Sequence, residues 1–184
     1  MCVYIYIYIY TYIYICVCVC MSIYMSMSIY TPPATQVNYV AKGARIYSPG
    51  EPVPGAASVV ARYLRTAYLW DAVRVQGGAY GCGLSFDRTS GTAVYSSYRD
   101  PNVLATLDAY DGTAAFLRRT EINDAELSKA IIGAVGDLDS PQAVNAKGFT
   151  SMLRWMVNLS EEDRQEWRSQ VYGIYVYRYR YRCI

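Results

Sequence analysis

The sequence predicts an α+β domain, with a mostly antiparallel sheet packed on helices, and three features of residues 35–171 support this prediction. The domain opens with a stretch of alternating apolar and polar residues, followed by a stretch with helical spacing. Two further strand-like stretches then flank a short turn sequence, which is typical of an antiparallel hairpin. Consecutive helical stretches follow the hairpin, so strands gather in the first half and helices in the second.

The first strand and the first helix are predicted from their periodicity. Residues 36–47 (QVNYVAKGARIY) alternate well enough for a strand and end at Ser48-Pro49-Gly50, which has the composition of a turn. Residues 56–70 (AASVVARYLRTAYLW) carry apolar side chains at positions 59, 60, 63, 64, 67 and 68, the spacing of one helical face. We therefore expect a strand over 36–47 and a helix over 56–70.

The hairpin is predicted over residues 77–86 and 92–98. Both stretches have strand-like composition, and they are separated by Asp87-Arg88-Thr89-Ser90-Gly91, residues that favour turns. The hairpin is followed by Asp100-Pro101, in which the aspartate can cap a helix whose first residue is the proline. We expect that helix to run to about Arg118.

Three more helices are expected after it. Asn123-Asp124-Ala125-Glu126 resembles a helix start, and the helix should continue towards Asp137. A further helix is expected over residues 148–157. Ser160-Glu161-Glu162-Asp163 opens the last one, because acidic residues are favourable in a first turn, and this helix runs into the C-terminal tail.

The two ends of the chain are built from very few residue types. Residues 3–15 read VYIYIYIYTYIYI, and the last residues read VYGIYVYRYRYRCI. Simple DNA repeats encode such pairs; ATATAT, for example, is translated as Ile-Tyr. We therefore interpret residues 1–34 as a low-complexity Ile/Tyr/Cys/Val repeat and residues 172–184 as a Tyr/Arg tail, both translated from repeat DNA and flanking one domain over 35–171.

The physical alternatives for residues 3–20 are a strand and a membrane span. A period of two residues suits a strand, but Ile on one face and Tyr on the other leave no solvated face. Without charge or proline, the segment is expected to aggregate. Tyrosine prefers the membrane interface to the bilayer centre, so a span is not favoured, and no basic residue supports a targeting peptide.

Charge and residue types exclude several classes of function. The formal net charge is +2 and no basic patch stands out, which argues against nucleic-acid binding. The sequence contains no histidine, the commonest zinc ligand and general base. Five of the six cysteines lie in the repeats, where C-x-C-x-C lacks the C-x-x-C spacing of structural zinc sites, and Cys82 alone fits a reducing compartment. We therefore assign no catalytic residue and no metal ligand.

Four ordered motifs carry a family resemblance. They are YLWDAVRVQGGAY (68–80), SYRDPNVLATLDAYDGTAAFL (97–117), KAIIGAVGDLD (129–139) and NAKGFTSMLRW (145–155). Together they resemble the C-terminal domain of presequence proteases, members of the pitrilysin and insulin-degrading-enzyme superfamily of zinc metallopeptidases. The resemblance implies a pitrilysin-like domain, truncated at its C-terminal edge where the Tyr/Arg repeat begins.

The resemblance also implies the substrate-binding residues Arg74 and Tyr80, with Gly77 and Gly78 between them. In this family an arginine and a tyrosine hold the substrate near the scissile bond, and a guanidinium and a phenol are donors suited to carbonyl and oxyanion oxygens. The simpler readings are a solvated arginine at a helix end, a core tyrosine in a strand, and glycines that serve only the turn.

What the chain lacks shapes the expected function. The family's inverted H-x-x-E-H zinc motif is absent, so zinc is expected only in a missing N-terminal half. The resemblance thus implies the substrate-binding fragment of a metalloendopeptidase for short unfolded peptides, inactive alone, with the peptide and the catalytic half as partners. Mitochondrion or plastid is the implied compartment. The alternatives are a non-catalytic interaction module and a non-functional product of a truncated gene.

Other conspicuous residues receive structural interpretations. The carboxylates of Asp137 and Asp139 are expected to end a helix in solvent, and those of Asp108 and Asp111 to form a solvated edge. Three tryptophans are expected in the core or at a domain contact: Trp70, Trp155 and Trp167.

Overall fold

The structure is a computed structural model that describes residues 37–48 and 51–180, without the side chains of 175–180. The repeat of residues 1–34 and the C-x-C-x-C sequence lie outside the described residues. The elements are β1 (Asn38–Arg45), α2 (Ala56–Leu64), η2 (Arg65–Gln76), β2 (Gly81–Asp87), β3 (Thr92–Asp100), α3 (Leu104–Arg119), α4 (Asp124–Leu138), α5 (Val144–Met156) and α6 (Glu161–Arg180). This order confirms the predicted α+β class.

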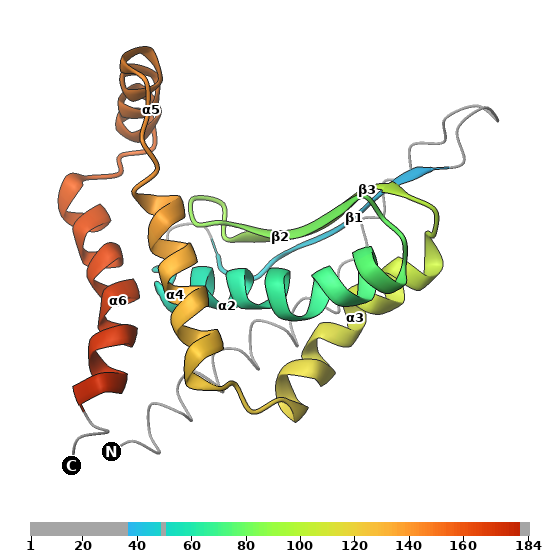
Figure 1. Ribbon diagram of the computed structural model, residues 1–184. Helices are drawn as coiled ribbons and strands as arrows, with labels where there is room; N and C mark the ends of the chain where they lie inside the picture. The colour runs from blue at the N-terminus through green and yellow to red at the C-terminus, as the bar shows by residue number, and fades with distance from the viewer. Residues whose placement is uncertain (1–36, 49–50, 181–184) are drawn as a thin grey trace.

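The three strands form one antiparallel sheet in the order β1-β3-β2. In this sheet Ser97 of β3 lies between Val40 of β1 and Cys82 of β2. One face of the sheet packs on η2 and α3. Figure 1 shows α2 and η2 running as one rod beneath the sheet, with α3 beneath its far end. The predicted hairpin is confirmed as β2 and β3.

The rod formed by α2 and η2 extends beyond the predicted end at Trp70 to Gln76. From Arg65 its turns are those of a π-helix, and the amide of Gly77 donates to the carbonyl of Ala72 five residues back. The rod ends where Gly78 adopts a φ of +79°, a left-handed conformation that glycine tolerates and other residues disfavour. The extension places Arg74 in the last helical turn.

Two hydrophobic clusters form the core. One joins α2 to α3, α4 and α6: Val59, Tyr63, Leu64, Leu117, Ala130, Ile131, Ala134 and Val171. The other lies between the sheet, η2 and α3: Val40, Leu69, Val73, Ala79, Tyr95 and Tyr110. The second cluster supports the end of η2 and the start of β2, so it fixes the segment that carries the candidate site.

The predicted starts of α4 and α6 are confirmed by their caps. The Asn123 side chain accepts a hydrogen bond from the amide of Glu126, 2.8 Å away. Ser160 and Asp163 form a reciprocal capping box, in which each backbone amide donates to the other side chain at 3.0 Å. The helix α5 begins at Val144, four residues before the predicted start at 148.

The prediction that Asp100 caps a helix beginning at Pro101 is wrong. Asp100 is the last residue of β3, and α3 begins at Leu104. The carboxylate is fully buried and accepts hydrogen bonds from Ser97 and Thr106, so tertiary partners take the place of a helix cap.

The three tryptophans were expected in the core or at a domain contact, and of the three only Trp167 packs against the core. Trp70 is 49% exposed and Trp155 is 82% exposed, whereas Trp167 packs against the α2–α4–α6 cluster. The carboxylate of Asp137 is 3.0 Å from Arg62, and that of Asp139 is 2.6 Å from Arg168. These two carboxylates therefore connect helices, in addition to lying at a helix end.

The acidic residues of α3 differ from each other. Asp108 is exposed, as predicted, but Asp111 pairs with the buried ammonium of Lys42 on β1. In the part of the chain that the structure describes, no helix combines the length and apolar character needed to cross a membrane.

Buried Tyr110 predicts sensitivity to alkaline pH. Its hydroxyl donates to the carbonyl of Val40, and burial raises the pKa of Tyr110 far above the ordinary value of 10.0, with Asp100 adding to the effect. Because the folded state holds this proton more tightly than the unfolded chain, stability is retained below pH 10 and falls as the pH rises further. The urea midpoint should therefore fall more steeply between about pH 9 and about pH 11 for the natural chain than for Tyr110→Phe. Equal slopes would contradict this assignment.

The ends of the chain lead to a second prediction. Residues 1–34 carry no charge, whereas α6 continues past residue 172 with Val171 and Ile174 packed in the core. A chain trimmed to residues 35–176 should therefore keep its melting temperature and be more soluble than the full chain, because it loses the aggregation-prone repeat. Solubility after ultracentrifugation and a thermal melt provide the measurement. A lower melting temperature after trimming would show that the repeat belongs to the fold.

Candidate functional site

The predicted site residues lie in the segment that connects η2 to β2. Arg74 occupies the last turn of η2, Gly77 and Gly78 form the turn, and Tyr80 immediately precedes β2. Three backbone hydrogen bonds hold the turn: Gly77 to Ala72 at 3.1 Å, Gly78 to Arg74 at 3.0 Å and Ala79 to Val73 at 3.1 Å. The segment is thus fixed against the end of the helix before any ligand is present.

Both glycines are required by the turn itself. A Cβ on Gly77 would lie 2.5 Å from the carbonyl oxygen of Val73, and Gly78 has the positive φ. A side chain at either position would displace the path from Arg74 to Tyr80. This structural role exists whether or not a ligand contacts the glycine backbone.

The Arg74 guanidinium stacks on an exposed aromatic ring. Its Cζ lies 3.9 Å from the centroid of the Trp70 ring, one helical turn earlier. Among the described residues no carboxylate pairs with Arg74. The stacking orients the planar group while leaving its N–H donors available to a ligand.

Tyr80 lies at the surface, so the core interpretation of this residue is wrong. Its side chain is 59% exposed, and its ring contacts Tyr98 edge-on at 5.3 Å between centroids. The guanidinium of Arg99 lies 5.7 Å from the Tyr80 ring, and the Tyr80 amide donates to the Arg99 carbonyl at 3.3 Å. Arg74 and Tyr80 therefore each belong to a separate cation–aromatic pair at the same end of the sheet.

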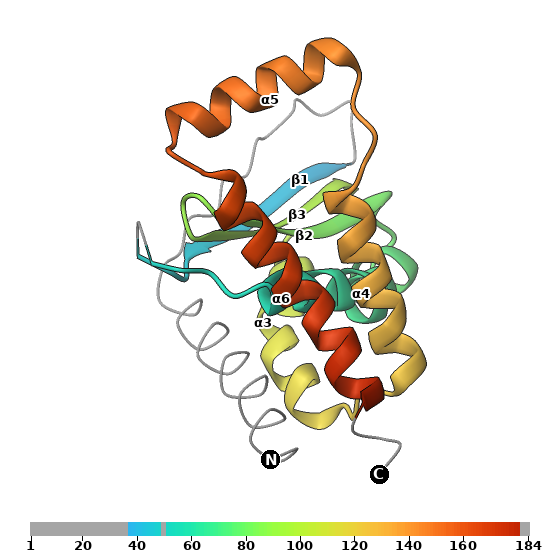
Figure 2. The same ribbon diagram turned by 90° about the vertical axis from the view of Figure 1, so that its left-hand side faces the viewer.

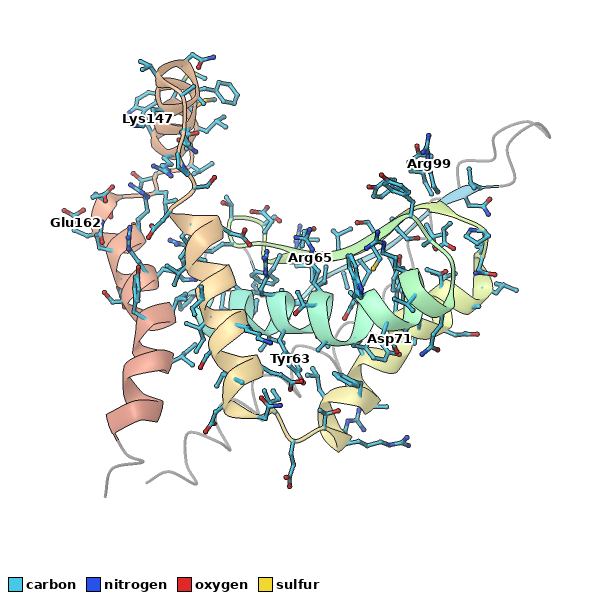
Figure 3. The ribbon with its side chains drawn as sticks, viewed as in Figure 1. Tyr63, Arg65, Asp71, Arg99, Lys147 and Glu162 are labelled. Carbon is cyan, nitrogen blue, oxygen red and sulfur yellow. The ribbon has the colours of Figure 1, made fainter. Side chains whose placement is uncertain are left out.

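Tyr98 and Arg99 were missed by the sequence prediction. The Tyr98 ring covers Gly81, where a Cβ would come within 2.2 Å of it, and Arg99 has a left-handed φ of 50°. Figure 3 shows Arg99 rising from the end of the sheet, on the side away from η2. No local pattern in SYRDPN singles out these two residues, because the left-handed backbone of Arg99 and the contact of Tyr98 with Gly81 are known only from the fold.

A buried network behind the surface positions the turn. The Asn102 side-chain amide donates to the Gly77 carbonyl at 2.5 Å, and its backbone amide donates to Asp100 Oδ1 at 2.9 Å. Asp100 Oδ2 accepts from the hydroxyls of Ser97 at 2.6 Å and Thr106 at 2.8 Å. Asp100 therefore connects β3 and the start of α3 to the glycine turn.

The arrangement provides donors and aromatic surfaces but no activated nucleophile. Cys82 is close by, but burial raises the pKa of its thiol against the opposing influence of Arg65 and Arg74, and its Sγ donates to the Leu69 carbonyl. Exposed guanidinium and phenol groups can bind peptide carbonyls and carboxylates. The site is therefore suited to binding a polar chain.

The donor set does not fit a catalytic zinc ion. Such sites require histidine or carboxylate ligands that converge, and the sequence contains no histidine. Among residues 37–48 and 51–180, no three His, Cys, Asp or Glu side chains gather within reach of one ion.

Comparison with protein families identifies the domain. Residues 30–176 match the family model described as the PreP C-terminal domain, which covers the strands, helices and candidate site described above. The chain belongs to the presequence protease family. The resemblance inferred from the four motifs is thereby confirmed.

Individual presequence proteases show the same similarity. The chain is 50% identical over 137 residues to presequence protease 1, chloroplastic/mitochondrial, of Arabidopsis thaliana, covering 74% of this chain and 13% of the relative. It is 31% identical over 140 residues to the mitochondrial presequence protease of Xenopus tropicalis, covering 75% and 13%. It is also 39% identical over 135 residues to protein HypA of Clostridium perfringens, covering 73% and 14%.

These matches also show how much of each relative the chain covers and in which compartments the relatives are located. The chain spans only about 13% of the length of these presequence proteases. The names of the plant and animal relatives place them in mitochondria or chloroplasts, the compartments that the resemblance implied.

Proposed function

We propose that this chain is the peptide-binding part of a presequence protease and has no peptidase activity by itself. The observation that carries the proposal is that half-buried Arg74 and exposed Tyr80 flank a turn that is rigidly held within the family-matched domain. In this proposal the guanidinium and the phenol bind backbone carbonyls of an unfolded peptide. Each donor also stabilises negative charge that develops on the reacting carbonyl.

Rigid attachment supports this role. The turn between the two residues is held by the Asn102 amide and by three backbone hydrogen bonds, so both donors are oriented before the peptide arrives. Preorganised donors lose little conformational freedom on binding, which favours interactions that strengthen in the transition state. The neighbouring aromatic rings of Trp70 and Tyr98 provide surface for apolar side chains of the peptide.

The catalytic chemistry is proposed to lie outside this chain. The residues here lack the ligands for zinc and a general base, so the metal of the resembled peptidases would be bound by the catalytic half. That half is the second proposed partner, beside the peptide. By the names of the relatives, the expected substrates are presequence peptides.

The isolated chain should bind no stoichiometric zinc and cleave no peptide. After incubation with zinc and dialysis, metal analysis should give far less than one ion per chain, because no set of ligands closes around an ion. A fluorogenic presequence peptide should remain intact. Retention of one zinc ion per chain together with cleavage that a chelator abolishes would refute the proposal.

An intact enzyme for further tests can be made from the Arabidopsis relative. Replacing its corresponding segment with the family-matched residues 30–176 of this chain gives a protein that we call the chimera. We expect the chimera to cleave the peptide that the isolated chain leaves intact. Effects of Arg74 and Tyr80 on turnover can then be measured with this chain's own residues in place.

A further inference from the structure

The helix α5 has an exposed apolar side that nothing in the described chain covers. None of its residues is buried, and its hydrophobic side chains are exposed by 44% to 87%. In both ribbon views α5 extends beyond the ends of α4 and α6 and lies apart from the sheet (Figures 1 and 2). The exposed apolar residues of the helix and its last turn are Val144, Phe149, Met152, Leu153, Trp155, Met156 and Val157.

In a self-contained domain the apolar side of a helix faces the core, but in α5 a mostly polar side faces the domain and the apolar side faces outward. Ala146, Thr150 and Arg154, spaced four residues apart, form the partly covered strip that faces the body of the domain. Lys147 and Ser151 lie beside that strip, and with Arg154 they line a polar hollow of about 470 Å³ against the α4–α5 connection. The apolar arc is therefore directed away from the domain's own core.

The charge of α5 specifies the kind of surface it fits. The helix contains Lys147 and Arg154 and no acidic residue, and Arg164 of α6 lines the same hollow. Figure 3 shows Lys147 on this isolated helix. A complementary surface has an apolar groove to accept Trp155 and Phe149 and carboxylates along the edge that meets these cations.

We propose that α5 is a docking helix for the part of a presequence protease that lies outside the segment matched by this chain. The relatives carry about seven times more sequence than the match covers, so a covering surface is available within one protein. The inference rests on the proposed function, because it treats this chain as one part of such a protease. The helix is about 20 Å long, enough for a contact of several anchoring side chains but short for a dimer interface by itself.

Hydroxyl-radical footprinting tests the proposal directly, because Met152, Trp155 and Met156 are readily oxidised. The isolated chain and the chimera are exposed to the same radical dose, and oxidation is quantified by peptide mass spectrometry. Oxidation of these three residues should fall by about tenfold in the chimera, where the rest of the protease covers α5. Equal oxidation in both proteins would overturn the proposal.

A pair of charge variants gives an independent test. Trp155→Asp and Ser169→Asp introduce the same new charge, the first on the apolar arc of α5 and the second at an exposed position of α6. In the isolated chain neither should change the melting temperature, because both side chains are exposed. In the chimera, Trp155→Asp should lower the melting temperature and increase protease sensitivity of α5, whereas Ser169→Asp should have little effect. A loss of stability of the isolated chain with Trp155→Asp would show that α5 packs internally and would overturn the proposal.

Two other occupants are separated by measurements on the isolated chain. Light scattering that shows a dimer, dissociated by Trp155→Asp, would assign α5 to a second copy instead. Sedimentation with phosphatidylserine vesicles, abolished by Trp155→Asp, would assign it to a membrane surface. Dimer formation or vesicle binding, combined with no protection of α5 from oxidation in the chimera, overturns the proposal. Protection in the chimera with unchanged turnover on mutating Tyr80 would support docking while refuting the peptide-binding function.

Discussion

Tyr80→Phe in the chimera is expected to lower turnover of an unfolded presequence peptide by about a hundredfold, the typical effect of losing one oxyanion-type donor. The substitution removes only the hydroxyl. The ring stays in contact with Tyr98 and Arg99, and the side chain is 59% exposed, so the fold has little to lose. The melting temperature should therefore be unchanged.

Arg74→Lys tests the other donor in the same assay. Lysine keeps the positive charge but loses the planar fork and its stacking on Trp70, so turnover should fall about tenfold or more. Tyr172→Phe is the matched control, since Tyr172 is an exposed tyrosine on α6, at the other side of the molecule from the end of β3 (Figure 1). Near-normal turnover for both Tyr80→Phe and Arg74→Lys would leave this domain without a role in holding substrate.

Asp100→Ala should lower the free energy of unfolding by about 3 kcal/mol, the largest stability effect we expect in this chain. The carboxylate is fully buried and accepts from Ser97, Thr106 and the amide of Asn102. Alanine leaves these donors without an acceptor in the core. Asp100→Asn keeps one acceptor oxygen and should have an intermediate effect.

Urea denaturation followed by circular dichroism measures this prediction on the natural chain. Asp108→Ala is the matched control, because Asp108 is exposed on α3 and its removal should change stability by no more than about 0.5 kcal/mol. If Asp100→Ala were as mild as Asp108→Ala, the network would not hold the glycine turn. In the chimera, Asn102→Leu should lower turnover while changing the melting temperature little, because Asn102 holds the Gly77 carbonyl directly.

Elements with strong local signals were predicted from the sequence. The hairpin follows from the Asp87-to-Gly91 turn, in which the Asp87 carboxylate accepts from the amides of Thr89 and Ser90. The starts of α4 and α6 follow from Asn123 and Ser160, whose side chains accept from nearby amides. In each case the decisive contacts lie within three residues, where sequence alone can show them.

Elements decided by distant contacts were predicted less well. Asp100-Pro101 has the local pattern of a helix start, but Ser97 and Thr106 bind the carboxylate in the folded core. The end of the first helix was placed at Trp70, because its apolar spacing was followed only from residue 59 to residue 68, whereas Leu69 and Val73 are buried in the π-helical continuation. Trp155 was expected in the core or at a domain contact from its residue type, which shows that the side chain is apolar but not which surface covers it.

The candidate site divides in the same way. Arg74 and Tyr80 were identified by family resemblance on a contiguous motif, and the exposure of Tyr80 and the stacking of Arg74 on Trp70 agree with the proposed role. Tyr98, Arg99 and Asn102 join the site only through the register of β2 with β3 and the packing of the following loop. No pattern along the chain brings these residues to the Gly77 turn.

Photocrosslinking from position 80 shows directly whether the turn between η2 and β2 contacts the substrate. The chimera carries the change Tyr80→p-benzoylphenylalanine and is irradiated with a labelled presequence peptide in the presence of a chelator to prevent cleavage. If the turn binds substrate, a crosslink should form between position 80 and the peptide and be abolished by excess unlabelled peptide, and no crosslink should form from the same group at position 172. Absence of a crosslink at position 80, or an equal one at position 172, would contradict the claim that this domain binds the substrate through the turn between η2 and β2.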